Sequence, residues 1–269
     1  MKRNQAPTVD PYHHIAEYYD LEHDDFRDDI DLLLQFAGIV DGPILEMGCG
    51  SGRVLAPLAE AGSVVVGLDI SGTMLARAET RIHATGVGER VTLVRADMID
   101  AAIAPGGPFG LVVFSLNALM HLAAPERQLK ALHNAGRALD SHGQVIIDLV
   151  NPTAEHLVSL ASAPLLEGSW TLDDCSTVDK WSSRTISASH QVIDTTIWYD
   201  RVTPDGQLTR RRTQFELRYL HLNELTLMLT HAGFGDVRVY GSYDLDPLDD
   251  ASDRIIVTAS MAPSEAGKS

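Results

Sequence analysis

The segment Ile44–Val54, with the sequence ILEMGCGSGRV, constrains the fold more than any other part of the chain. A short, mostly apolar run leads into a turn with glycine at every second position, Gly48, Gly50 and Gly52. Glycine has no Cβ, so the backbone of such a turn can pass very close to a ligand. The helix expected behind the turn presents unpaired N–H groups to the same place. The pattern predicts a strand, a ligand-binding turn and a helix in succession.

A second apolar run follows about twenty residues later and ends in an acid. Val64–Leu68 has the character of a strand that is covered on both faces, and Asp69 comes directly after it. An acid at the tip of the neighbouring strand can accept hydrogen bonds from a ribose diol. The two segments together predict a nucleoside cofactor at the carboxyl ends of a parallel sheet.

The residues around the glycines narrow the choice of nucleoside. A dinucleotide fingerprint, G-x-G-x-x-G, requires its third glycine where this chain has Arg53, and the Gly-Lys-Ser/Thr of a P-loop is absent. The carboxylate of Glu46 would repel a pyrophosphate and attract a cation. The sequence therefore predicts a nucleoside without phosphates that carries a positive centre.

The segment from about residue 44 to 150 resembles the class I S-adenosylmethionine-dependent methyltransferases. Glu46 with the glycine turn resembles the first motif of that family, and Asp69-Ile70 resembles the second. Ala96-Asp97-Met98 resembles the acidic third motif, and Phe114-Ser115-Leu116-Asn117 resembles the fourth-strand motif. The resemblance implies a Rossmann-like, doubly wound α/β fold with a mostly parallel seven-stranded sheet. It also implies S-adenosylmethionine as cofactor and S-adenosylhomocysteine as product.

The same resemblance implies roles for individual residues in binding the cofactor. Gly48, Gly50 and Gly52 would let the backbone approach the cofactor closely, Glu46 would contact its ammonium, and Arg53 and Tyr19 would contact its carboxylate. Asp69 would bind the ribose hydroxyls, Ile70 and Met98 would pack on the two faces of the adenine, and Asp97 would accept a hydrogen bond from the adenine amine. Ser115, in the fourth motif, is a further cofactor-binding residue. Two alternatives stay open at this point. Arg53 is equally typical of a solvated first turn of a helix, and Tyr19 of an aromatic packed in a cap.

The sequence predicts five successive regions along the chain. These are an N-terminal helical cap at 1–40, the cofactor-binding core at 41–150, an antiparallel β insertion after strand five at 151–221, a return to the core sheet at 222–261 and a flexible tail at 262–269. The cap is expected to hold helices at 12–20 and 26–37. Ser71 is a candidate N-cap, and Pro125 suits a first helical turn. Within the insertion, 185–201 and 207–220 are expected to be two long strands around the turn Pro204-Asp205-Gly206.

This layout resembles bacterial small-molecule methyltransferases of the glycine and amino-sugar N-methyltransferase type, which share a Tyr-Tyr-Asp element, here Tyr18-Tyr19-Asp20, and a roofing insertion. The resemblance places the acceptor near Tyr18, Trp170, Trp198, Tyr219 and His221, although strand aromatics are often core residues. His121 follows strand four and is the candidate catalytic residue, as a general base or an acceptor-orienting group. The alternative for His121 is a purely structural histidine.

Composition bounds the partners. The chain has 269 residues, 21 of them basic and 37 acidic, and a net charge of −16 disfavours a nucleic-acid partner. No apolar run approaches the ~20 residues of a membrane helix, and the start Met1–Pro7 lacks the apolar stretch of a signal peptide. Two cysteines, Cys49 and Cys175, indicate no disulfide framework, which favours the cytoplasm. The histidines have no metal spacing, so no metal is expected, and the sequence leaves monomer and homodimer open.

The sequence thus predicts in-line transfer of a methyl group to a nitrogen, oxygen or carbon of a small molecule, in natural-product or secondary metabolism. A general base is needed only if the acceptor must lose a proton. Two alternatives remain, because a fold does not fix a reaction. The bound cofactor could serve non-methylating chemistry such as cyclisation, or the chain could be an inactive cofactor-binding regulatory subunit.

Overall fold

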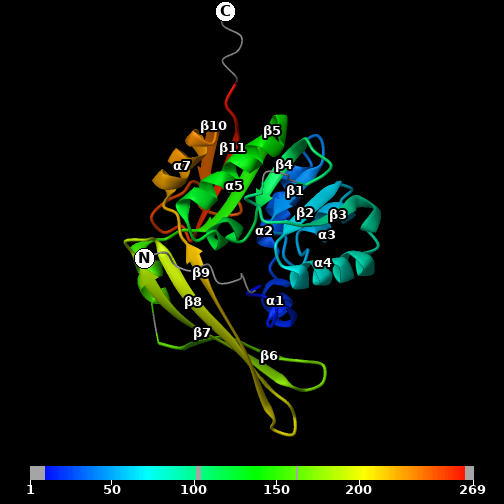
Figure 1. Ribbon diagram of the computed structural model, residues 1–269, viewed down its shortest axis with the longest axis vertical. Helices are drawn as coiled ribbons and strands as arrows, with labels where there is room; N and C mark the ends of the chain where they lie inside the picture. Colours follow the sequence, from blue (N-terminus) through cyan, green and yellow to red (C-terminus); the bar gives the residue numbers. More distant parts are fainter. Residues whose placement is uncertain (1–9, 101–103, 162, 264–269) are drawn as a thin grey trace, which may run out of the picture.

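The computed structural model describes residues 10–100, 104–161 and 163–263 and contains two β-sheets, one in the core and one in the insertion (Figure 1). The start Met1–Pro7 and residues 264–269 of the expected tail lie outside the described residues. Within the described ranges, no helix has the length and apolar character needed to cross a bilayer.

The core sheet has seven strands in the order β3-β2-β1-β4-β5-β11-β10. Strands β1 to β5 are parallel to one another, whereas β11 is antiparallel to both β5 and β10. This confirms the expected mostly parallel seven-stranded sheet. The strands are β1 (Ile44–Met47), β2 (Val65–Asp69), β3 (Val91–Arg95), β4 (Phe109–Phe114), β5 (Leu139–Val150), β10 (Phe234–Tyr240) and β11 (Arg254–Met261).

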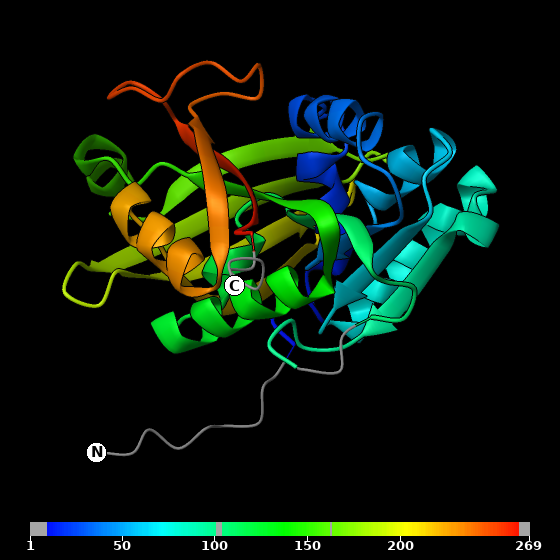
Figure 2. The same ribbon diagram turned by 90° about the horizontal axis from the view of Figure 1, so that it is seen from above.

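Successive residues of the central strands point to opposite faces of the sheet, and each face carries its own hydrophobic cluster. Ile44 of β1 packs with α2, α3 and α4, whereas Leu45 packs with α5 and α7 on the other face. Figure 2 shows α5 and α7 on one face and α2 on the other. The helices are α2 (Asp28–Ala37), α3 (Leu55–Glu60), α4 (Gly72–Thr85), α5 (Pro125–Ala138) and α7 (Leu222–His231), with short 3₁₀ turns η1 (Gly88–Arg90) and η2 (Ala118–His121).

Local signals in the sequence set the ends of these helices. Ser71 is the N-cap of α4, where its hydroxyl accepts a hydrogen bond from the Met74 N–H, and Gly86 ends the helix in the left-handed conformation. Pro125 occupies the first turn of α5, where its missing N–H costs nothing. The sequence-based expectations for Ser71 and Pro125 are therefore confirmed.

The insertion follows α6 (Ala154–Leu160) and is a four-stranded antiparallel sheet. Its strands are β6 (Leu165–Thr171), β7 (Thr177–Ser187), β8 (Val192–Val202) and β9 (Leu208–Arg218), and the β8–β9 turn lies at the end farthest from the core (Figure 1). The turn at 204–206 is as expected, but the single strand expected at 185–201 is wrong. The chain reverses direction at 188–191, between β7 and β8. Gln191 adopts there a left-handed φ of 55°, a conformation that glycine usually provides. The turn contains no glycine or proline, so the sequence pattern gave no sign of it.

The N-terminal segment lies between the core and the insertion. Its helix α1 (Ala16–His23) begins later than the expected 12–20 and packs on the insertion through the small cluster of Ile15, Tyr18, Val178, Ile197 and Tyr199. The backbone before the helix is also held, because Thr213 of β9 donates a hydrogen bond of 2.6 Å to the Pro11 carbonyl. The segment thereby joins the two sheets around the carboxyl ends of β1, β2 and β4.

The contact between α3 and the sheet gives a first test. Gly67 of β2 has an ordinary φ, but an added Cβ would lie 2.3 Å from the Leu55 Cδ1 and 2.8 Å from the Cys49 Sγ. We expect Gly67→Ala to lower the free energy of unfolding by about 1–3 kcal/mol, because overpacking a close-packed core forces its neighbours to move. Gly88→Ala is the control, since its nearest neighbour would lie 4.0 Å away. Equal stability of the two variants in urea denaturation would contradict this packing.

Candidate functional site

The glycine turn between β1 and α3 is built for close approach of a ligand. Gly48, Gly50 and Gly52 have φ values of 87°, 53° and 75°, a conformation that side chains rarely adopt. An added Cβ on Gly48 would lie 3.0 Å from the Ala118 Cβ. The Gly50 N–H donates to the Asp69 carboxylate at 2.9 Å, which ties this turn to the end of β2.

Glu46 is the most unusual group at this site. It is buried at the centre of β1, and its Oε1 accepts a hydrogen bond of 2.6 Å from the Ser115 hydroxyl. Its Oε2 is buried and has no hydrogen-bond partner within the described part of the chain. Burial raises the pKa of Glu46 to about 8. A buried acceptor without a partner is costly, so this atom fits a cationic or N–H-bearing ligand above the glycine turn.

The end of β2 offers acceptors and an apolar surface side by side. One oxygen of Asp69 accepts from Gly50, and the other accepts from the Ser71 N–H at 2.8 Å. Both oxygens keep a lone pair for further donors such as ribose hydroxyls. Ile70 leaves 52% of its surface exposed, in keeping with its proposed place against a flat base.

The third motif lies beside this surface. Met98 is close to the glycine turn, since its terminal methyl carbon would be 3.5 Å from a Cβ on Gly48. Asp97 forms an ion pair of 2.7 Å with Arg127 and accepts a hydrogen bond from the Ile99 N–H. The adenine-binding roles of Asp97 and Met98 stay predictions.

Arg53 has a protein partner that the sequence analysis did not anticipate. Its two terminal nitrogens form an ion pair with Asp29 of α2, and Nη1 also donates to the Phe26 carbonyl at 2.8 Å. Arg53 is buried, so the idea of a solvated first-turn arginine is wrong. A contact with the cofactor carboxylate would have to use the donors that Asp29 and Phe26 leave.

Two tyrosines of the N-terminal segment, Tyr19 and Tyr12, face this site. Burial raises the pKa of Tyr19, and the charges of Arg53, Glu46 and Asp69 also act on it, which places its hydroxyl near the glycine turn. The ring of Tyr19 stacks on His23 with centroids 4.2 Å apart.

The Tyr12 hydroxyl lies 3.3 Å from the His121 Nε2. Phe215 of the insertion completes the group, with its ring centroid 5.5 Å from that of His121 and 6.4 Å from that of Tyr12. Burial lowers the pKa of His121 to about 4, so the imidazole is neutral near pH 7. The sequence analysis missed Tyr12 and Phe215, which come together with His121 only through tertiary structure.

The residues expected to bind the acceptor lie in several different surroundings. Tyr18 stacks on Tyr199 inside the cap cluster, and Trp170 packs against the same cluster. Trp198 lies on the opposite face of β8 from Ile197 and Tyr199, where it stacks on Trp181. Tyr219 is buried in the main core, and His221 is exposed just before α7. The structure thus gives Tyr18, Trp198 and Tyr219 packing partners in the protein, and the acceptor-binding roles of these residues, of Trp170 and of His221 stay predictions.

Comparison with known proteins gives a domain match for the core and similar solved structures for the fold. A sequence family described as a methyltransferase domain matches residues 44–143. The ribosomal protein L11 methyltransferase of Thermus thermophilus is 32% identical over 132 residues, which are 48% of this chain and 50% of that protein. The CcbJ methyltransferase of Streptomyces caelestis is a similar solved structure, with a TM-score of 0.70, 24% identity and coverage of 88% of this chain and 95% of that one.

A second solved structure is similar over nearly the whole chain. CalS10 of Micromonospora echinaspora, an amino pentose methyltransferase with bound S-adenosylmethionine, gives a TM-score of 0.69 at 18% identity, covering 97% of this chain and 100% of that one. Residues 44–143 thus match a methyltransferase domain, and nearly the whole chain shares its fold with these two methyltransferases. The chain spans about half the length of the curated relatives it matches.

The raised pKa of the Glu46 carboxyl predicts how the affinity for the cofactor product depends on pH. With a pKa of about 8, its carboxyl is largely protonated in the free protein near pH 7, whereas a ligand ammonium favours the carboxylate. We expect binding of S-adenosylhomocysteine to release a proton and its Kd to fall as the pH rises from about 6 to 7.5, below the range where the ligand's own amine loses its proton. Calorimetry in buffers of different ionisation enthalpy measures this release, and Glu46→Gln should abolish it.

The raised pKa of Glu46 also predicts how the free energy of unfolding changes with pH. Because the folded pKa lies above the unfolded one, the contribution of Glu46 is greatest at low pH and is lost as the pH rises towards about 8. The free protein should lose stability over that range, and Glu46→Gln should lose less. A wild-type protein whose binding and stability are both independent of pH would contradict the assignment.

Asp69 provides a separate test of the ribose position. Asp69→Asn keeps the shape and one carbonyl oxygen but loses the charge, and we expect it to weaken S-adenosylhomocysteine binding by about 10- to 100-fold. Asp236→Asn is the matched control, because Asp236 is exposed on β10. Unchanged affinity in the first variant would mean that the nucleoside lies elsewhere.

Proposed function

We propose that the protein transfers the methyl group of S-adenosylmethionine to an amine nitrogen of a small molecule. The observation that carries the proposal is the buried, unpartnered oxygen of Glu46 beside the glycine turn, which fits the ammonium of that cofactor. When bound, S-adenosylmethionine supplies a methyl group on a sulfonium and leaves as a neutral thioether. CalS10, whose fold this chain shares, acts on an amino pentose, and this supports an amine as acceptor.

The charge around the site supports a cationic ligand. Asp10, Glu22 and Asp69 lie near enough to Tyr12 to raise its pKa, in addition to the larger effect of burial. The nearby cation Arg53 is neutralised by Asp29. Glu22 is paired with Lys180 of the insertion, so the negative charge that remains comes from Asp10 and Asp69, and it attracts both a sulfonium and an amine. The aromatic faces of Tyr12 and Tyr19 can contribute cation–π attraction.

The residues of this chain orient the acceptor and exclude water. A histidine with a pKa of about 4 is a weak acceptor for the whole proton of an alkylammonium. Neutral His121 can instead accept a hydrogen bond from the N–H of a free amine and so direct its lone pair. The Tyr12 hydroxyl beside Nε2 holds the imidazole in place. Of the two roles expected for His121, this favours the orienting one, and orientation alone can supply ~7–11 kcal/mol of the barrier in good cases.

Incubation with methyl-labelled cofactor tests the proposal directly. A panel of primary and secondary amines, with phenols and alcohols of matched size, should show label transfer to the amines. Conversion of an acceptor without label transfer would favour non-methylating chemistry such as cyclisation. Cofactor binding without any conversion would favour an inactive regulatory subunit. A role in natural-product metabolism, a cytoplasmic location and the choice between monomer and homodimer stay predictions.

His121 gives the sharpest mutational test. We expect His121→Ala to lower kcat by about 10- to 100-fold through loss of acceptor orientation, while the Kd for S-adenosylhomocysteine changes less than about twofold. With cofactor and acceptor saturating, kcat of the wild type should show no inflection from His121 near pH 6.5, the ordinary value for histidine, because burial lowers the pKa of His121 to about 4. His133→Ala is the control, because the ring of His133 in α5 contacts the ring of His231 in α7, not the groups around His121. Full activity of the His121 variant would assign it a structural role.

A further inference from the structure

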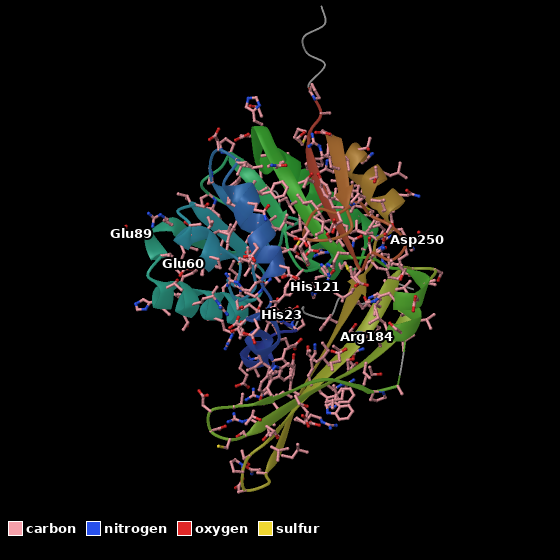
Figure 3. All side chains as sticks on the ribbon, turned by 180° about the vertical axis from the view of Figure 1, so that it is seen from behind. His23, Glu60, Glu89, His121, Arg184 and Asp250 are labelled. Carbon is pink, nitrogen blue, oxygen red and sulfur yellow. The ribbon has the colours of Figure 1, made fainter. Side chains whose placement is uncertain are left out.

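A buried polar network lies where the end of β9 returns from the insertion to the core. Figure 3 shows His121 at this meeting of core and insertion. His121 is the last residue of η2, and its ring lies beside that of Phe215 of β9, with centroids 5.5 Å apart. Because one ring belongs to the core and the other to the insertion, their relative position depends on how η2 is fixed to β9.

Gln128 of α5 joins the backbones of these two segments. It is fully buried, and its Nε2 donates hydrogen bonds to the Leu119 carbonyl of η2 at 3.3 Å and to the Arg218 carbonyl of β9 at 3.0 Å. Leu119 lies two residues before His121. Arg218 lies three residues after Phe215. One side-chain amide thus bridges two carbonyl groups that are close in sequence to the two rings.

Arg218 completes the bridge and holds the amide of Gln128 in one orientation. The guanidinium donates from Nη1 to the Gln128 Oε1 at 2.7 Å and from Nη2 to the Oε1 of Glu224 in α7 at 2.5 Å. Only 6% of the Arg218 side chain is exposed, so its charge is buried, and Glu224 supplies the counterion. Because the oxygen of Gln128 accepts from a cation, its nitrogen is the atom that faces the two carbonyls.

The turn between β7 and β8 belongs to the same network. The side chain of Gln191 accepts from the Arg218 Nη2 at 3.2 Å and donates to the Glu224 Oε2 at 2.6 Å. Its amide also donates to the Tyr219 carbonyl at 3.2 Å. The network therefore ties this end of the insertion sheet to α5 and α7. Hydrogen bonds depend on direction, so they favour one arrangement of the joined segments more strongly than apolar contacts do.

We propose that Gln128 and Arg218 are positioning residues, which hold η2 against β9 and thereby fix His121 relative to Phe215. This inference rests on the proposed role of His121 in orienting the acceptor. Gln128 and Arg218 act through the backbone that they hold. A displacement of about 1 Å in a group that orients a reactant can lower the rate by about 100-fold.

The expected cofactor contacts have other supports. Glu46 accepts its hydrogen bond from Ser115, and Asp69 accepts from the Gly50 N–H of the glycine turn. A loosened contact between η2 and β9 should therefore impair methyl transfer more than cofactor binding. This difference between kcat and cofactor affinity separates a positioning role from a general loss of structure.

The first experiment follows the His121 imidazole by NMR and depends on no reaction. Burial lowers the pKa of His121 to about 4, so its signal in the wild type should hardly shift between about pH 5.5 and pH 8. Gln128→Met removes the two donors and keeps the length of the side chain. We expect water to reach the loosened contact in this variant, which should raise the pKa of His121 towards the ordinary 6.5.

Two points make this NMR measurement specific. The spectrum of His121→Ala identifies the signal of this imidazole among those of the other histidines. Tyr12, the titratable group beside Nε2, keeps its proton over the whole range, because burial raises its pKa. A shift of the signal with pH therefore reports the surroundings of His121.

The second experiment measures methyl transfer. We expect Gln128→Met to lower kcat by about 10- to 100-fold, while the Kd for S-adenosylhomocysteine changes less than about twofold. Phe234→Leu is the control for lost stability, because Phe234 is buried in β10 and lies beside Gly136, in the last turn of α5. This control should lower the melting temperature and leave kcat unchanged.

Combination with Phe215→Ala shows whether Gln128 acts through this ring. If the network acts by placing Phe215, Gln128→Met should change kcat less than about threefold once residue 215 is alanine. If Gln128→Met does not fold, Arg218→Lys provides the same tests. Its single ammonium keeps a cation for Glu224 but cannot serve Gln128 at the same time.

Three results would overturn the proposal. These are a His121 signal that stays as in the wild type, a kcat as unchanged as that of Phe234→Leu, or effects of Gln128→Met and Phe215→Ala on kcat that simply multiply. If the pKa of His121 rises as expected and no amine is methylated, the positioning network stands and the proposed reaction fails.

Discussion

The burial of Glu46 is the constraint on which the site depends. The sheet places a carboxyl group at its centre, between two faces of aliphatic packing, and gives it one hydroxyl partner instead of a cation. A buried carboxylate without a counterion is unfavourable, so the free protein holds this group in its neutral form. The glycine turn above it has no side chains to fill the space. The fold therefore builds a place whose energy improves when a ligand brings positive charge.

The N-terminal segment and the insertion complete what the core leaves open. Asp20 of α1 accepts a hydrogen bond from Ser51 of the glycine turn and also pairs with Arg77 and Arg81 of α4. Asp10 accepts from Ser71 at the start of α4. The segment before α1 thereby crosses the ends of β1 and β2, and Tyr12 reaches His121 and Phe215. This layering buries the groups around His121, and in such surroundings each nearby charge acts more strongly than it would in water.

The core and the cofactor site could be predicted because their signals are local. Strand, turn and helix succeed each other within Ile44–Val54, and Asp69 stands at the tip of the next strand, so parallel topology brings them together. The acceptor side could not be predicted. Tyr12 and His121 are 109 positions apart, and the pairing of β7 with β8 is hidden until the turn between them is located. Because that turn lacks glycine and proline, the sequence pattern predicted one strand in place of two, and the register between β7 and β8 could not be derived.

The ion pairs leave the charge around the site unevenly distributed. Arg53 is neutralised by Asp29 close to the glycine turn, and Glu22 is paired with Lys180, which leaves the carboxylate of Asp69 to set the potential there. On the insertion, Lys180 and Arg184 pair with Glu22 and Glu167, so the charges of that cluster sum to zero. The unbalanced charge therefore lies at the carboxyl ends of the core strands, where it favours a ligand that carries positive charge.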